Sequence, residues 1–316
     1  MARRAAIPDI DSVKVAVLIP CKDEHITVGG VVDAFRGQLP HSTIWVCNNA
    51  SVDDTAERAA EAGAYVIDET LRGKGNAVRR LFACVEADVY VLVDGDGTYS
   101  AESVRPLVLE LLKERLEMVV AKRMAVGDQQ TDAYRRGHAW GNRAFATLIR
   151  KLFGVNVTDP FSGYRVFSRR FVRSFPALSG GFEIETELTI HALELGMTIR
   201  EVPTRYFGRP AGSTSKLNTF RDGIRIALTL LHLYEQVKPL TFFVAFATLL
   251  AGISLFLGVP VVLDYLRTGL VPRFPTAILA SATMLLAFLS AVCGAILDTV
   301  ARARREAKRL AFLAGS

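Results

Sequence analysis

Cysteine is scarce in this sequence of 316 residues, and its four cysteines lie far apart, at Cys21, Cys47, Cys84 and Cys293. No two of them have the spacing of metal ligands, which argues against a metal centre held by thiolates. They fall in apolar stretches or at the ends of expected strands. We therefore expect buried free thiols in a protein of a reducing compartment.

The sequence also lacks the short signatures of several binding classes. No Gly-x-Gly-x-x-Gly follows the first expected strand, which argues against a dinucleotide oxidoreductase, and the absence of a Walker lysine pattern argues against a P-loop NTPase. The net charge is +6, yet no Lys/Arg tract is interleaved with aromatic residues, so we expect no nucleic-acid partner. This basic balance favours lipid headgroups and phosphates as partners.

We also expect no signal peptide, and we find no internal repeat and no low-complexity segment. Arg3 and Arg4 precede an apolar stretch over residues 13–20, but this stretch is short and Lys14 interrupts it. It lacks the long apolar core of a signal peptide, and we expect a strand there.

Apolar runs typical of strands alternate with helical patterns in the first part of the chain. Strands are expected over residues 13–20, 43–47, 65–67, 89–93 and 118–121, and helices over residues 26–38, 55–62, 73–85 and 101–115. This alternation predicts a doubly wound α/β domain with a mainly parallel sheet.

The strand expected over residues 89–93 is followed directly by two carboxylates. Asp94 and Asp96 are separated and followed by glycine, at the carboxyl end of the strand, where open α/β sheets bind their ligands. Two oxygen ligands on a tight turn suit a hard divalent cation that shares its other sites with water and substrate phosphates. The alternative is a polar turn that merely ends the strand, since Asp-Gly is a common turn dipeptide.

Polar residues also follow the other expected strands. Residues 20–24, 48–53 and 94–98 all lie at carboxyl ends of parallel strands, so we expect them to share one crevice. Polar and acidic groups concentrated there suit a nucleotide.

The stretch over residues 132–206 is α/β with fewer clear strands. We expect a helix over residues 133–153, a turn-rich loop over residues 158–165 and a helix over residues 182–195. The start of this last helix carries Glu183, Glu185 and Glu187, which capping and the helix dipole alone could explain.

A basic, hydroxyl-rich segment comes next, with Arg205, Arg209 and residues 212–216. It is either a solvated loop or a contact for anionic headgroups or phosphates.

Two uncharged stretches, residues 239–263 and 274–297, dominate the C-terminal part. A helix over the first spans roughly 36 Å at about 1.5 Å per residue, enough for a hydrocarbon core of about 30 Å. The alternative is a buried helix hairpin in a soluble core. An amphipathic pattern over residues 218–238 predicts an interfacial helix leading into the first span.

Basic residues flank this pair of spans on one side. Residues 301–316 form a basic tail and Lys238 precedes the first span, whereas the connecting loop holds only Arg267 and Arg273. The excess predicts a multi-pass protein of the cell membrane, with both termini and the preceding domain cytoplasmic.

Several motifs match, in order, those of a known family. They are Ile19-Pro20 with Glu24, Asn49-x-Ser51-x-x-Asp54-Thr55, Gly73-Lys74-Gly75, Asp94-x-Asp96, Ser162-Gly163-Tyr164-Arg165, and Arg209 with Ser215-Lys216. With them the chain resembles the polyprenyl-phosphate glycosyltransferases of glycosyltransferase family 2, the dolichyl-phosphate mannosyltransferase-like group with a GT-A fold. The resemblance covers residues 13–217, and the two-span hairpin matches the integral-membrane members.

The resemblance implies a cytoplasmic GT-A domain over residues 1–217 and assigns roles within it. Contacts to a nucleotide-sugar donor are implied for Pro20, Glu24, Asn49, Asp54, Lys74 and Asp94. Phosphate or acceptor contacts are implied for Arg123, Arg136, Arg165, Arg209, Ser215 and Lys216. Catalytic roles are implied for Asp96 and for Asp159, the acidic residue near the acceptor. The residues implied to bind a Mg²⁺ or Mn²⁺ ion are Asp94, Asp96 and Thr98.

The chain departs from the family pattern at three places. Asn48 and Asn49 stand where many members have two aspartates, Lys22 and Asp23 replace a frequent Tyr-Asn, and Thr98 stands where some members use glutamine. These departures leave the nucleotide and the third metal ligand open.

The reaction implied by the resemblance is an inverting, metal-dependent transfer of a hexosyl group from a UDP- or GDP-linked sugar to a polyprenyl monophosphate. The alternatives are a family 2 enzyme with another lipid-linked or glycan acceptor, and a catalytically inactive membrane scaffold. A processive synthase normally has a Gln-x-x-Arg-Trp motif and more spans, and this chain has neither. The sugar, the polyprenol and the oligomeric state, a homo-oligomer included, stay open.

Overall fold

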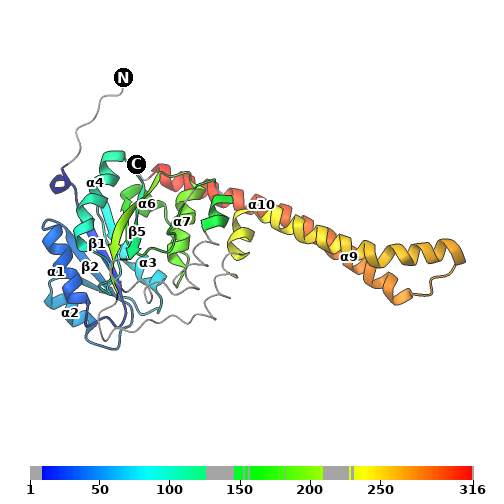
Figure 1. Cartoon of the computed structure of the whole chain (residues 1–316), viewed down its shortest axis with the longest axis horizontal. Helices are drawn as coiled ribbons and strands as arrows, with labels where there is room; N and C mark the ends of the chain where they lie inside the picture. Colours follow the sequence, from blue (N-terminus) through cyan, green and yellow to red (C-terminus); the bar gives the residue numbers. More distant parts are fainter. Residues whose placement is uncertain are drawn as a thin grey trace, which may run out of the picture. The chain divides into compact units, whose positions relative to one another are not determined.

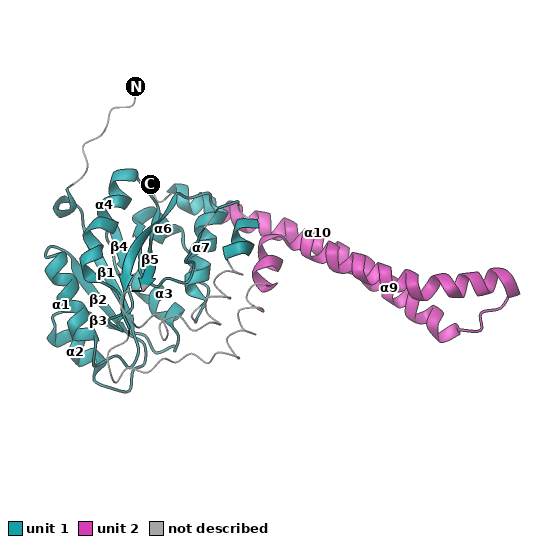
Figure 2. Cartoon of the chain, viewed as in Figure 1, with its two compact units in different colours: residues 1–225, 308–316 teal, residues 226–307 magenta. Residues whose placement is uncertain are grey.

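The computed structural model describes residues 9–125, 146–151, 154–155, 157–181, 183–208, 228 and 231–314. The chain divides into two compact units, one of residues 1–225 with 308–316 and one of residues 226–307, which we describe separately (Figure 2).

Unit 1 is an α/β domain in which strands and helices alternate as the sequence predicts (Figure 1). Its first part consists of β1 (Val15–Cys21), α1 (Val28–Gln38), β2 (Thr43–Asn48), α2 (Thr55–Glu61), β3 (Tyr65–Asp68), α3 (Lys74–Cys84), β4 (Val89–Leu92), α4 (Val104–Glu114) and β5 (Met118–Ala125). Short 3₁₀ turns lie at Ile10–Ser12 and Ala101–Ser103. Its second part consists of β6 (Arg165–Ser168), α6 (Arg169–Ser174), α7 (Ile184–Glu194) and β7 (Ile199–Tyr206).

The strands form one seven-stranded sheet of order β3-β2-β1-β4-β6-β5-β7. β1 pairs in parallel with β2 and β4, β2 with β3, and β5 with β7, whereas β6 is antiparallel to both of its neighbours, β4 and β5. The prediction of a mainly parallel sheet is therefore confirmed. Because β6 begins at the edge where β4 and β5 end, the loop before β6 reaches that same edge.

Helices cover both faces of the sheet, as expected for a doubly wound fold. Val15, Val17 and Ile19 of β1 pack in one cluster with residues of α1, α2 and α4. Ala16 and Leu18, which point to the opposite face, pack with residues of α3, α6 and α7. Strands covered on both sides are apolar without interruption, which explains the continuous runs in the sequence.

The cysteine prediction holds for two of the four residues. Cys21 and Cys47 are buried free thiols, whereas Cys84 and Cys293 are exposed. Cys84 is the last residue of α3, off the face that packs on the sheet, and Cys293 lies on an apolar helix of unit 2. The expectation of burial is corrected for these two.

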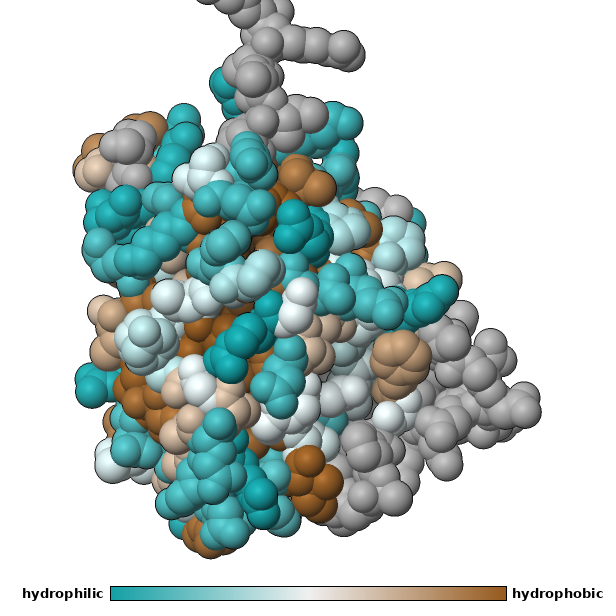
Figure 3. All heavy atoms as spheres, turned by 90° about the vertical axis from the view of Figure 1, so that its left-hand side faces the viewer, coloured by the Kyte–Doolittle hydropathy of each residue, from teal (hydrophilic) through white to brown (hydrophobic). Residues whose placement is uncertain are grey.

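Unit 2 is built on two long apolar helices, α9 (Pro239–Thr268) and α10 (Phe274–Ala314). Both are long and apolar enough to cross a membrane, and few of their side chains are buried, unlike those of a soluble core helix. The face of unit 1 shown in Figure 3 differs, since hydrophilic side chains cover most of it and hydrophobic ones are scattered among them. These observations indicate membrane anchoring by α9 and α10.

The two apolar helices pack together along small side chains that recur at every seventh position. The buried residues at this spacing are Ala247, Ser254 and Val261 on α9 and Ala280, Ala287, Gly294 and Ala301 on α10. Ser254 Oγ also donates a hydrogen bond to the carbonyl of Ala280 at 2.7 Å. Small residues let helix backbones approach closely in a membrane, which fits the predicted hairpin.

The segment expected as a basic tail, residues 301–316, is helical as far as Ala314 and continues α10. Its last part belongs to unit 1, where Lys308 Nζ lies 2.8 Å from Glu194 Oε2 on α7. The Phe312 ring packs against the guanidinium of Arg170 on α6, with the guanidinium carbon 4.1 Å from the ring centre.

Two of the expected helices are described only in part. Residues 146–151, within the helix expected over residues 133–153, are helical, and so are residues 231–237 of the expected interfacial helix. The domain boundaries given above therefore stay predictions.

Candidate active site

The two carboxylates after β4 lie at the predicted edge of the sheet. Gly95, between them, packs over β1 so closely that a Cβ atom there would overlap the Cys21 sulfur. Asp96 is buried, and its Oδ1 accepts hydrogen bonds from the backbone N–H of Thr98 at 3.1 Å and from its hydroxyl at 2.6 Å. Thr98 thus orients Asp96, while its role as a metal ligand stays a prediction.

Asp94 takes part in a chain of three charges. The Lys74 ammonium lies 2.5 Å from Asp94 Oδ1 and 2.5 Å from Glu185 Oε1. Burial on its own would lower the pKa of Lys74, but the two carboxylates outweigh it and raise that pKa above its ordinary value. Gly163 makes room for this arrangement, because a Cβ atom there would overlap Asp94 Oδ2.

The donor set at this edge suits a hard divalent cation. Asp94 and Asp96 offer carboxylate oxygens, which Mg²⁺ prefers and Mn²⁺ accepts. Among the residues that the structure describes, no group of three or more His, Cys, Asp or Glu side chains is placed to hold a metal. A cation bound here would therefore complete its coordination with water and with oxygens of a substrate diphosphate.

The Gly73-Lys74-Gly75 turn at the start of α3 packs against residues 179–181. The backbone N–H of Gly75 donates to the Gly181 carbonyl at 3.1 Å. Cβ atoms at positions 73 and 75 would overlap the Gly180 and Ser179 carbonyls. Both glycines thus serve a close backbone approach, and Lys74 is the residue of the motif that faces the carboxylates.

Asn49, predicted to contact the donor, is buried and bonded to the backbone of the loop between β3 and α3. Its Nδ2 donates to the Leu71 carbonyl at 2.7 Å, and its Oδ1 accepts from the Gly73 N–H at 2.6 Å. The side chain therefore holds that loop in place, and a direct donor contact does not fit these bonds.

The loops after β1 and β2 are bonded to each other, so residues 20–24 and 48–53 lie together as expected, whereas the crevice expected from them and residues 94–98 stays a prediction. The Glu24 N–H donates to Thr55 Oγ1 at 2.8 Å, and Asp23 and Ser51 are linked in the same way at 3.0 Å. Pro20 is the penultimate residue of β1, and Asp54 is the N-cap of α2 at the end of the second loop.

Asp53, in the second of these loops, lies 2.6 Å from the His25 ring nitrogen. Its burial would raise the pKa of Asp53, but hydrogen bonds from Thr55 and His25 hold that pKa below its ordinary value.

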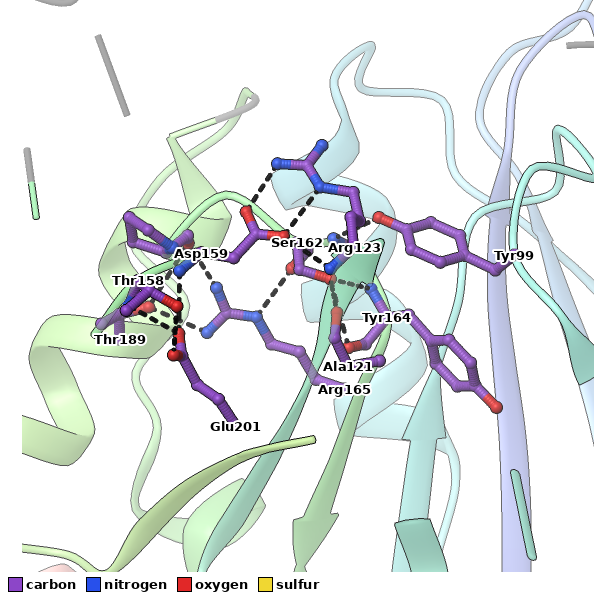
Figure 4. Close-up of polar contacts among 12 residues, drawn as sticks. Tyr99, Ala121, Arg123, Thr158, Asp159, Ser162, Tyr164, Arg165, Thr189 and Glu201 are labelled. Carbon is purple, nitrogen blue, oxygen red and sulfur yellow. Dashed lines mark hydrogen bonds and ion pairs between the residues drawn. The ribbon is translucent and has the colours of Figure 1, made fainter. Parts of the chain in front are cut away.

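Asp159 and Arg123 form a bidentate ion pair on the loop before β6 and at the end of β5 (Figure 4). Arg123 Nε and Nη2 donate to Asp159 Oδ2 and Oδ1 at 2.9 and 2.6 Å, and the Arg123 N–H adds a third bond at 3.0 Å. Asp159 is buried, and both of its carboxylate oxygens accept hydrogen bonds from Arg123. Asp159 orients Arg123 in this geometry.

Arg165 lies beneath the same loop, as Figure 4 shows, and is fully buried. Its guanidinium donates to the carbonyls of Ser162 and Pro160 at 2.9 and 2.5 Å and to Thr189 Oγ1 at 2.9 Å. Burial lowers the pKa of Arg165 to about 10. The predicted phosphate contact does not fit this position, because the side chain has no exposed surface, and Arg165 instead supports the loop.

Two further residues fix this loop and were not predicted. Glu201 of β7 accepts hydrogen bonds from the backbone N–H groups of Thr158 and Asp159, both at 2.8 Å, and from the Thr158 hydroxyl at 2.6 Å. Tyr99, which follows the carboxylate turn, accepts from the Gly163 N–H at 3.0 Å. The loop therefore sits between the β4 edge and β7.

Comparisons with known proteins agree with this geometry. The model of the glycosyl transferase family 2 matches residues 16–175 of the chain. The chain is 34% identical over 251 residues to glycosyltransferase AglJ of Haloferax volcanii, across 78% of this chain and 80% of that protein. It is 27% identical over 215 residues to an undecaprenyl-phosphate mannosyltransferase of Micrococcus luteus, across 64% and 86%. The chain belongs to glycosyltransferase family 2.

The fold of this family 2 glycosyltransferase is also found in a solved structure. A crystal structure of glucosyl-3-phosphoglycerate synthase from Mycobacterium tuberculosis, in complex with Mg²⁺ and uridine diphosphate, is similar with a TM-score of 0.55 at 25% identity, across 71% of this chain and 79% of that chain. The predicted enzyme class and the predicted GT-A-like fold are thereby confirmed.

Some predicted site residues of the glycosyltransferase lie outside the described part of the chain. They are Arg136, Arg209, Ser215 and Lys216. Glu185, in contrast, is described, and the contact with Lys74 goes beyond the capping role that its place near the start of α7 suggested.

Proposed function

We propose that this family 2 glycosyltransferase transfers a hexosyl group from a UDP- or GDP-linked sugar to a polyprenyl monophosphate, with inversion, at the cytoplasmic face of the membrane. The observation that carries the proposal is the pair Asp94 and Asp96 at the end of β4, in a domain whose chain continues into two apolar helices. The mannosyltransferase of Micrococcus luteus, by its name, uses undecaprenyl phosphate, which supports a lipid acceptor.

The donor half of the proposal rests on the loops at the carboxyl ends of β1, β2 and β4. The related synthase binds Mg²⁺ together with uridine diphosphate, and the oxygens of Asp94 and Asp96 suit the same kind of ion. A divalent cation held by these two residues would supply positive charge that stabilises the leaving diphosphate. We assign to the nucleotide Pro20, near the end of β1, together with Glu24 and Asp54, which lie between β1 and α1 and between β2 and α2.

The acceptor half rests on the loop before β6. An oxygen of the lipid phosphate attacks the anomeric carbon, the bond from that carbon to the diphosphate breaks, and the nucleoside diphosphate leaves. Arg123, held by Asp159, contacts a phosphate of the donor or of the lipid in this proposal. The acceptor phosphate is already ionised near neutral pH, so no general base is required, and Asp159 acts by positioning Arg123.

The experiment measures transfer of radiolabelled sugar from a panel of nucleotide sugars to polyprenyl phosphate, using the purified protein in detergent with and without Mg²⁺ or Mn²⁺. We expect metal-dependent product with one donor and a loss of about 100-fold or more in Asp96→Ala, a typical effect for a group that stabilises a developing charge. Asp88→Ala is the matched control, because Asp88 is an exposed carboxylate just before β4.

Each outcome of this assay is informative. Retained activity in Asp96→Ala would contradict the role of the carboxylate pair. Donor binding without any lipid product would contradict the polyprenyl acceptor and favour another lipid-linked or glycan acceptor, which the same assay can then test.

A further inference from the structure

The Lys74 ammonium occupies a position that a metal ion would contest. It lies 2.5 Å from Asp94 Oδ1, and the Lys74 side chain is only 11% exposed. A carboxylate oxygen that accepts a short hydrogen bond from an ammonium is a weaker ligand for a second cation, since the two positive charges repel each other. Binding of a divalent ion at Asp94 therefore requires this contact to loosen.

Glu185 is a second ion-pair partner for the Lys74 ammonium. Its side chain is 7% exposed, and its Oε1 already lies 2.5 Å from Lys74 Nζ. Its other oxygen, Oε2, is buried and has no hydrogen-bond partner among the residues that the structure describes. Glu185 can thus accept more from Lys74 than it does now, without any other group being displaced.

The surroundings limit how far the three groups can move. Gly163 packs directly against both Asp94 Oδ2 and Lys74 Nζ, since a Cβ atom there would come within 2.9 Å of Nζ. Lys74 itself begins α3, whose first turn is bonded to residues 180 and 181. The ammonium can exchange partners by a small rotation of its side chain, whereas a movement of the backbone is opposed by these contacts.

We propose that Lys74 exchanges its carboxylate partner when a metal ion binds, from Asp94 to Glu185. Without metal, Lys74 neutralises Asp94. When the divalent ion binds, Asp94 becomes a ligand of the ion and loses its contact with Lys74, while the Lys74 ammonium stays paired with Glu185. Glu185 is then a positioning residue that acts on the metal site through Lys74. This inference rests on the proposed metal-binding role of Asp94 and Asp96.

The test is a double-mutant cycle on metal affinity, which needs no turnover. Mn²⁺ is titrated into the purified full chain, and free Mn²⁺ is followed by electron paramagnetic resonance. Lys74→Met removes the competing ammonium, so the Kd for Mn²⁺ should fall by about tenfold, and Glu185→Gln leaves the ammonium with Asp94 alone, so the Kd should rise by about tenfold.

The double variant decides between exchange and simple electrostatics. If Glu185 acts through Lys74, the effect of Glu185→Gln disappears in the Lys74→Met background, and the double variant binds Mn²⁺ like Lys74→Met. If both residues act only as independent charges, their effects add, and the Kd of the double variant returns to the wild-type value, which would overturn the proposal.

Three controls complete the cycle. Glu183→Gln removes the same charge from an exposed side chain next to the start of α7 and should leave the Kd within about twofold of wild type, as exposed charges do. Glu185→Asp keeps the charge, so its Kd for Mn²⁺ should lie close to that of wild type. It supports the role of the charge if Glu185→Gln folds poorly. Asp94→Asn should abolish binding. Absence of Mn²⁺ binding in both wild type and Lys74→Met would overturn the metal site itself, whereas binding with additive effects overturns only the exchange.

Discussion

His191 is a histidine of the α7 helix that the fold keeps neutral. The residue is 1% exposed, and its Nε2 lies 2.9 Å from Ser174 Oγ. Its ring packs edge-on against Phe171 and Phe175. Burial, with a smaller contribution from the charge of Lys308, lowers the pKa of His191 to about 3.

This lowered pKa predicts acid sensitivity. A histidine that titrates near pH 6.5 when unfolded and near pH 3 when folded stabilises the fold fully above pH 6.5 and loses this contribution as the pH falls. Between pH 7 and pH 5 the loss is about 2 kcal/mol, at 1.36 kcal/mol per pH unit below the unfolded pKa. His191→Phe, which cannot titrate, should flatten the dependence of the melting temperature on pH over this range. An equal decrease for both proteins would assign the acid sensitivity to other groups.

Individual ligand contacts were the least predictable feature of the site. Asn49 and Arg165 belong to motifs of the family and carry polar side chains, yet both are buried and bonded to backbone groups. A sequence shows which residue types a motif contains, but it does not show whether a side chain turns toward a ligand or toward its own loop. The pair Asp94 and Asp96 was predictable, because its place depends only on the end of an apolar strand.

At the scale of elements, β7 determines the position of the loop before β6. Glu201 accepts two backbone N–H groups and one hydroxyl from residues 158 and 159 of that loop. This loop carries Asp159, which in turn orients Arg123. A change at Glu201 should therefore reach the acceptor side of the site while the carboxylates after β4 keep their places.

Glu201→Gln tests this arrangement. The amide loses the charge that the N–H groups bond to, so the loop should loosen and the fold should be destabilised by about 1–2 kcal/mol. We expect the transfer rate to fall by about tenfold, because a loosened loop no longer holds Asp159 and Arg123 in the geometry that the reaction needs. The affinity for uridine diphosphate should stay unchanged. Glu110→Gln is the control, because Glu110, on α4, pairs with Arg200, a residue of β7 at the surface. Equal losses in donor affinity and rate would mean that the loop also shapes the donor side.

The strands were predictable to the extent that they are apolar on both faces. β1, β2, β3 and β4 follow the expected runs closely, and β5 continues four residues beyond its expected end at Ala121, whereas β6 and β7 were not recognised. β6 has four residues and begins with Arg165, and β7 is mostly half-buried or exposed along its length. A buried arginine and an edge strand both break the apolar run that marks a strand in sequence, and their pairing partners lie far away in the chain.

At the scale of the whole molecule, the last turns of α10 complete the domain formed by unit 1. Lys308 pairs with Glu194, whose side chain is 5% exposed, and Phe312 packs against Arg170. The composition of residues 301–316 predicted a basic tail, and it gave no sign of this packing, because the partners lie on α6 and α7. The two long apolar helices themselves were predictable from length and charge alone.

A charge exchange tests this contact. Lys308→Glu places two carboxylates together at a nearly buried position and should destabilise unit 1 by about 3 kcal/mol, as expected for a buried charge that loses its partner. The double variant Glu194→Lys/Lys308→Glu restores opposite charges and should recover a large part of the melting temperature. Arg302→Glu is the control, since its pair with Asp298 is exposed on the arginine side and lies within α10. A melting temperature in Lys308→Glu like that of wild type would show that the contact adds nothing to stability.

The late position of Lys308 and Phe312 in the chain has a consequence for biosynthesis. The described strands and helices of unit 1 before residue 208 leave the ribosome first, and the two apolar stretches, residues 239–263 and 274–297, must follow before these two residues are made. Until then the nascent domain lacks the ion pair at Glu194 and the ring that covers Arg170. Maturation of the soluble part is therefore timed by completion of the hairpin, and a polypeptide cut short within it would expose this unfinished surface to chaperones and proteases.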